Sequence, residues 1–158
     1  MTTQKTPAAA AQMLIRKPAP EVFNAFVDPE ITKNFWFTKG SDKLETGKKV
    51  TWEWEMYNVI WTVTATEMIK DEKIILDESP APTMIEFNFR TVGDGATYVT
   101  VKQYGFTETG DALVEKIKGA TGGWTTVLDG AKIFLEHQIH PNFVADKFPK
   151  EAGINIKD

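Results

Sequence analysis

Two histidines near the C-terminus are the side chains of this chain that are best suited to metal binding. His137 and His140 are the only histidines, and a spacing of three places them on neighbouring positions of a predicted helix. Two metal ligands are geometrically feasible at that spacing, but nothing nearby is obviously a third. Cationic side chains are also favoured at helix C-termini for electrostatic reasons alone. We therefore expect no metal site and no cofactor.

The sequence offers no recognisable machinery for nucleophilic catalysis or nucleotide binding. It contains no cysteine, no Gly-x-Ser-x-Gly elbow, no phosphate-binding loop and no Gly-x-Gly-x-x-Gly signature. An acid–base enzyme that uses a buried aspartate or glutamate stays open, but no carboxylate is clearly placed for that role. We therefore lean towards a protein that is not an enzyme.

Gln103 is the single polar residue with the most informative position. In the predicted strand it shares a face with Val99 and Val101, and that face should point towards the covering helix. A buried amide that finds no partner costs about 1–3 kcal/mol. Gln103 therefore either orients a ligand or bonds to backbone or a neighbouring side chain near Gly105. Glu67 raises a similar question, but carboxylates at strand ends are usually solvated.

A group of large aromatic residues is predicted to lie on the inner face of the sheet and on the helix. These rings either line a pocket for an apolar or aromatic ligand or simply fill the core, and both alternatives are open. The residues expected to contact a ligand are Trp52, Trp54, Trp61, Phe87, Phe89, Gln103, Trp124, Val127, Leu128 and Ala131.

The helix that must cover these residues spans about 111–139, where large apolar residues recur in steps of three, four and seven. Gly119, Gly122 and Gly123 lie inside it and cost roughly 2–3 kcal/mol of helix propensity. They indicate either a hinge that opens a cavity beside Trp124 or a local bend between two helices. The best-supported portion runs from Gly123 to His140.

The other elements come before this helix. Pro18 and Pro20 open a short helix, and Asp28-Pro29-Glu30 is a typical N-cap and first turn of a second. Apolar and alternating patterns predict strands at residues 10–17, 50–56, 59–69, 74–76, 85–89 and 97–106. This order predicts an α+β fold in which a curved antiparallel sheet of about six to seven strands grips the long C-terminal helix.

Composition limits the partners. The 158 residues carry a formal net charge of −4 without a basic block, so nucleic acid is not expected as a partner. Neither a signal-peptide core nor a membrane-length apolar run is present, so we expect a cytoplasmic protein without membrane contact. One domain should cover residues 1–158, with a core at about 10–140 and a tail at 141–158.

The tail carries apolar residues that could dock on its own domain or on a second chain. We therefore expect a monomer or a homodimer and leave the choice open. The residues concerned are Phe143, Val144, Phe148 and Ile154.

Several short segments in this order and spacing resemble the SRPBCC/START-like helix-grip superfamily, which includes the Bet v 1-like proteins. The closest resemblance is to bacterial proteins similar to the C-terminal domain of the activator of Hsp90 ATPase. The chain departs from them at Gln103-Tyr104-Gly105, where His-Ser-Gly is common, and in its tail. The matching segments are Pro20-Glu-Val-Phe-Asn-Ala-Phe26, Asp28-Pro-Glu30, Gly47-Lys-Lys-Val-Thr-Trp52, Gly95-Ala-Thr97, Gly105-Phe106, Gly123-Trp124, Val127-Leu128 and Phe134-Leu-Glu136.

The resemblance implies a cavity between the sheet and the long helix, but it does not transfer a mechanism. Our leading expectation is a non-catalytic domain that binds a small apolar or aromatic ligand. A protein-interaction module that contacts an Hsp90-type chaperone is the alternative from another class. An acid–base enzyme of the polyketide-cyclase type is the third.

Overall fold

The computed structural model describes residues 6–154. Our expectations about the N-terminal segment and the tail extend over residues 1–5 and 155–158, which lie outside this range. The elements in chain order are β1 (Ala8–Ile15), α1 (Ala19–Val27), α2 (Pro29–Thr32), β2 (Lys39–Gly40), β3 (Lys49–Trp54), the 3-10 turn η1 (Glu55–Tyr57), β4 (Val59–Ile69), β5 (Lys73–Asp77), β6 (Met84–Val92), β7 (Ala96–Tyr104), α3 (Gly110–His137), α4 (Phe143–Lys147) and the 3-10 turn η2 (Lys150–Ala152).

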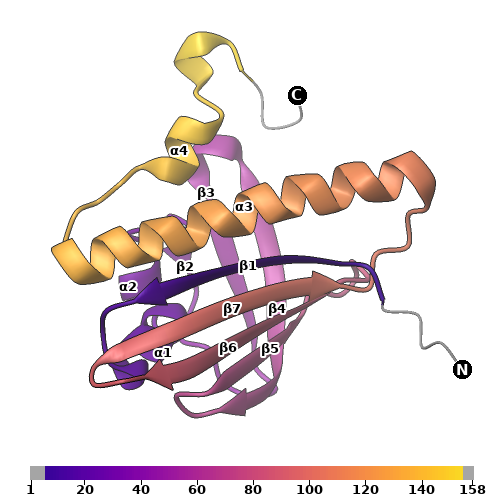
Figure 1. Cartoon of the computed structure of the whole chain (residues 1–158). Coiled ribbons are helices and arrows are strands. Elements are labelled where there is room, and N and C mark those ends of the chain that lie inside the picture. The colour runs from indigo at the N-terminus through magenta and orange to yellow at the C-terminus, as the bar shows by residue number, and fades with distance from the viewer. Residues whose placement is uncertain (1–5, 155–158) are drawn as a thin grey trace, which may run out of the picture.

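The strands form one antiparallel sheet with the order β1-β7-β6-β5-β4-β3-β2. Each strand from β2 to β6 pairs with the next one in the chain, and β1 forms the edge of the sheet beside β7. The sheet curls into a half-barrel, and α3 lies across its concave side (Figure 1). The predicted α+β helix-grip fold is confirmed.

The two short helices begin at prolines, as predicted. They lie at one end of the sheet (Figure 1). In α2 the side chain of Asp28 accepts a hydrogen bond from the backbone N–H of Glu30 at 3.0 Å, which is the predicted N-cap. Thr32 is fully buried and donates its hydroxyl to the carbonyl of Ala25, so the two helices are tied together.

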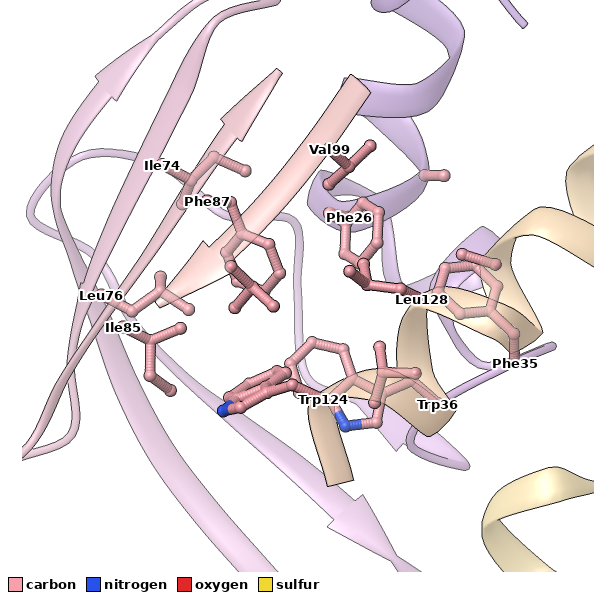
Figure 2. Packing of buried hydrophobic residues seen from close by; sticks show 14 of the residues in the cluster. Phe26, Phe35, Trp36, Ile74, Leu76, Ile85, Phe87, Val99, Trp124 and Leu128 are labelled. Atoms are coloured by element: carbon pink, nitrogen blue, oxygen red, sulfur yellow. The ribbon is translucent and has the colours of Figure 1, made fainter. Parts of the chain in front are cut away.

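The core lies under the second half of α3. Figure 2 shows Leu128 facing Phe26 and Val99, with Phe87 beside them on the sheet side. The rings of Phe26 and Phe87 lie 5.1 Å apart between centroids, a typical aromatic packing distance. Within α3 the fully buried residues begin at Trp124, whereas Leu113, Ile117 and Ala120 before it are half-buried.

The long helix differs from the sequence expectation in two respects. It continues without interruption through Gly119 and Gly123, so the suspected joint is not a helix boundary. It also ends at His137, three residues before the predicted stop, because Gln138 adopts the left-handed conformation with φ of 56°. The short strand β2 and the helix α4 were not predicted. In the described part of the chain, no helix is long and apolar enough to cross a membrane.

Candidate functional site

A pocket of about 620 Å³ lies between the first half of α3, the strands β3, β4 and β7, and the C-terminal helix α4. Its lining is mostly apolar, and four of its members are tryptophans. The lining residues are Trp36, Trp54, Tyr57, Val59, Trp61, Ala81, Pro82, Thr83, Gln103, Phe106, Glu108, Glu115, Lys116, Gly119, Ala120, Gly123, Trp124, Thr126, Val127, Val144, Lys147 and Phe148.

Small residues on α3 give this pocket its room. Gly119, Ala120 and Gly123 all line it, and a Cβ atom added to either glycine would meet no atom within 4 Å. Close packing against the sheet therefore does not explain these glycines. A leucine or phenylalanine at either position would instead project into the open space.

One corner of the pocket is polar and joins the helix to the sheet. The indole N–H of Trp124 donates to Oε1 of Gln103 at 2.9 Å, and Nε2 of Gln103 donates to Oγ1 of Thr83 at 3.2 Å. Thr83 donates its hydroxyl to Glu78, which also lies 3.5 Å from Nε2 of Gln103. An indole nitrogen can only donate, so Trp124 fixes which end of the amide faces it. We call these four residues the polar corner.

Gly105 positions the polar corner by bringing the loop between β5 and β6 against the end of β7. Its φ is +93°, and an added Cβ atom would lie 2.8 Å from the carbonyl oxygen of Pro82. Any other residue would strain the backbone and push this loop away. The glycine thus holds Thr83 within hydrogen-bond reach of Gln103.

Glu78 is a half-buried carboxyl group at the polar corner. Burial raises its pKa above the usual 4.5, the nearby charge of Asp77 adds to the rise, and the hydrogen bond from Thr83 opposes it. The net effect is an upward shift. Glu78 lies behind Thr83 and is not among the residues that line the pocket.

Helix α4 closes one side of the pocket. The hydroxyl of Tyr57 donates to the backbone carbonyl of Val144, and its ring lies 6.3 Å from the ring of Phe148. Burial also raises the pKa of Tyr57. Val144 and Phe148 both line the pocket, so this part of the predicted tail docks on its own domain. Phe143 and Ile154, by contrast, are exposed.

Charged side chains of both signs stand at the mouth. Glu108, Glu115, Lys116 and Lys147 line the pocket and are exposed except for Glu108, which is half-buried. Two carboxylates and two ammonium groups give the mouth no formal net charge. Among the lining residues these are the only charged ones, so the inner surface carries neither sign.

The structure divides the predicted ligand contacts into two groups. One group lines the pocket: Trp54, Trp61, Gln103, Trp124 and Val127. The other lies in the core, nearly or fully buried, and does not border the pocket: Trp52, Phe87, Phe89, Leu128 and Ala131.

Gln103 bonds to neighbouring side chains, which is one of the two roles expected for it. It also lines the pocket. Trp36 and Tyr57 line the pocket but were not predicted from the sequence. Trp36 follows the short helix α2 rather than a strand, so no alternating pattern marked it. Tyr57 sits in the turn η1, where the strand pattern ends.

The two histidines lie away from the pocket. His137 is exposed at the end of α3, and the ring of His140 packs against Phe134 at 5.3 Å. Within residues 6–154 no group of three or more histidine, cysteine, aspartate or glutamate side chains is arranged to hold a metal ion.

Comparisons with known proteins agree on the fold. The family described as Activator of Hsp90 ATPase homolog 1-like protein matches residues 16–136. The solved structure of SSP2350 from Staphylococcus saprophyticus is 29% identical, covers 85% of this chain and 95% of its own, and superposes with a TM-score of 0.75. The Aha1 dimer from Colwellia psychrerythraea is 18% identical, with coverages of 83% and 97% and a TM-score of 0.71.

A third solved structure is PFC0360w, an HSP90 activator from Plasmodium falciparum. It is 17% identical, with coverages of 82% and 96% and a TM-score of 0.64. At these identities the second and third structures show a shared fold. Among curated proteins, none matches the chain significantly.

Proposed function

The chain belongs to the Activator of Hsp90 ATPase homolog 1-like family, and from this premise we propose that it is a cytoplasmic domain that binds a small apolar or aromatic molecule without transforming it. The observation that carries the proposal is the pocket of about 620 Å³. Its size falls within the range of about 300–1,000 Å³ that small-molecule sites usually have, and its mostly apolar lining with a few polar groups is typical of them.

The glycines of α3 support the same proposal. Each glycine inside a helix costs about 1 kcal/mol relative to alanine, so Gly119 and Gly123 lower helix stability. An alanine would fit at both positions without a clash. Glycine at these positions leaves more open volume in the pocket at the expense of helix stability. An open volume is what a binding site requires.

The positions of the ionisable groups favour binding over acid–base chemistry of the polyketide-cyclase type. Among the described residues, the carboxylates that line the pocket are Glu108 and Glu115, and both belong to its mouth. The histidines lie at the opposite end of α3. Glu78 is held by Thr83 and Gln103 and does not border the space that a ligand would fill.

A titration with indane, a small aromatic hydrocarbon, tests the proposal. We expect saturable quenching of tryptophan fluorescence and a higher melting temperature in its presence. Gly123→Leu should abolish both effects, because the added side chain fills the pocket. Thr125→Leu, at an exposed position two residues on, is the matched control and should bind as the wild type does. Binding that survives in Gly123→Leu would place the ligand elsewhere.

Contact with an Hsp90-type chaperone is the second candidate, and the family description is what favours it. The solved structure from Plasmodium falciparum is itself named as an HSP90 activator. The two candidate functions are tested by different measurements. A pull-down with the cognate Hsp90 and an assay of its ATPase rate test this candidate, and an unchanged rate without capture would count decisively against it.

A further inference from the structure

Four tryptophans border the pocket, and their indole N–H groups differ in one respect. The N–H of Trp124 is bonded to Gln103, whereas those of Trp36, Trp54 and Trp61 have no hydrogen-bond acceptor among the described residues. The rings are close neighbours, since Trp36 lies 5.2 Å from Trp124 and 6.1 Å from Trp54 between centroids. The residues that border the pocket therefore include three tryptophans whose indole N–H groups are unpaired among the described residues.

Trp36 and Trp54 are the informative members because they are nearly buried. Each is only 6% exposed. In residues 6–154, no fully buried side-chain nitrogen or oxygen lacks a hydrogen-bond partner. The two unpaired N–H groups must therefore keep contact with open space. Trp54 borders only the large pocket of the two that are described, and Trp36 borders it together with a second of about 70 Å³.

The close-up view agrees with this placement. In Figure 2 the indole nitrogens of Trp36 and Trp124 lie at the same edge of the cluster, on the side away from Phe26 and Val99. The nitrogen of Trp124 is the one that bonds to Gln103, a lining residue of the pocket. The nitrogen of Trp36 thus faces the same side as a group that is known to border the pocket.

We propose that the indole N–H groups of Trp36 and Trp54 bind an oxygen acceptor of the ligand. The inference rests on the proposed function and narrows its ligand to a class: small apolar or aromatic molecules with a neutral hydrogen-bond-accepting oxygen, such as ketones, ethers or esters. An N–H that is removed from water needs an acceptor, and a pure hydrocarbon would leave both groups unsatisfied.

The charges of the pocket favour a neutral acceptor over an anion. The inner lining carries no cation, and the lysines at the mouth, Lys116 and Lys147, are balanced by Glu108 and Glu115. A carboxylate or phosphate drawn into this lining would lose its hydration without gaining a counter-charge. A ketone oxygen loses far less and gains the bonds from the two indoles.

A cycle of two ligands and three protein variants tests the proposal. The ligands are 1-indanone, which has a ketone, and indane, which has the same rings without it. The variants carry β-(3-benzothienyl)alanine at position 36, 54 or 52, because this residue keeps the shape of tryptophan and replaces N–H with sulfur. Position 52 is the matched control, since Trp52 is a core residue that does not border the pocket.

We expect the substitution at position 36 or 54 to lower the preference for 1-indanone over indane about fivefold, the equivalent of one ordinary hydrogen bond, without weakening the binding of indane. The substitution at position 52 should affect neither ligand. If both ligands bind and neither responds at position 36 or 54, the inference is overturned while the proposed function stands. If neither ligand binds the wild type, the proposed function itself fails.

Discussion

The indole N–H of Trp124 and the Oε1 atom of Gln103 are joined by a 2.9 Å hydrogen bond that connects α3 to β7. The bond lies where the buried half of the helix meets the half that covers the pocket. It fixes the orientation of the Gln103 amide, which in turn holds Thr83 and the loop that ends beside Gly105. Packing and pocket shape therefore depend on the same pair of residues.

The first prediction concerns this bond. Gln103→Leu should lower the free energy of unfolding by about 1–3 kcal/mol, because the N–H of Trp124 and the side chain of Thr83 lose their partner. Denaturation in urea measures the change. Gln12→Leu makes the same substitution at an exposed position of β1 and should change stability by no more than about 0.5 kcal/mol. Equal effects of both variants would contradict the structural role of Gln103.

The second prediction concerns the glycines of α3. Gly119→Ala and Gly123→Ala should each raise the free energy of unfolding by about 0.5–1 kcal/mol, because alanine favours the helix and its Cβ atom meets open space. Gly130→Ala is the matched control within the same helix. Its Cβ atom would lie 3.1 Å from the carbonyl oxygen of Phe35, so this variant should gain less or lose stability. A uniform response of all three would refute the assignment of open space.

The third prediction is a pH dependence that comes from Glu78. Its pKa in the folded chain is raised above 4.5 by burial, so folding favours the protonated form. Its contribution to stability is complete below about pH 4.5 and is lost as the pH rises through the raised pKa. The free energy of unfolding of the wild type, measured relative to Glu78→Gln, should thus fall between pH 4 and 7. A rise over this range would contradict the upward shift.

The fourth prediction has the opposite sign and concerns Glu136. Burial alone would raise its pKa, but the backbone N–H of Arg16 at 2.8 Å and the ammonium group of Lys132 at 2.7 Å lower it overall. Its contribution is present above pH 4.5 and is lost as the pH falls through the lowered pKa. Glu136→Gln should destabilise the protein by about 1 kcal/mol at pH 7, and this difference should shrink as the pH falls below 4.5. A difference that grows as the pH falls would contradict an ionic role.

Much of the fold could be predicted because local chemistry and burial point the same way. The alternation in β3 and the cap of α2 at Asp28 gave the right elements, since each depends on residues close in sequence. The break expected at Gly119 to Gly123 is absent. The low helix propensity of these glycines predicted a break. The packing of the helix from Trp124 onwards outweighs this propensity, so the helix continues through them.

The pocket was harder to predict than the fold. Trp54 and Trp61 border it whereas Trp52 does not, although all three belong to one predicted aromatic face. The alternation along a strand indicates which face of the sheet a residue belongs to. It does not indicate which residues of that face lie in the core and which border the pocket. Trp36 and Val144 reach the pocket from segments without a repeating pattern, so their place depends on the folded chain.

The central claim is that a small molecule binds among the tryptophans of the pocket. The most direct measurement is a two-dimensional proton–nitrogen NMR spectrum of the five indole N–H groups during a titration with 1-indanone. The account predicts saturable shifts of the Trp36 and Trp54 signals, with the signal of the core residue Trp52 the least affected. A spectrum that stays unchanged at saturating 1-indanone, or one in which Trp52 alone responds, would contradict it.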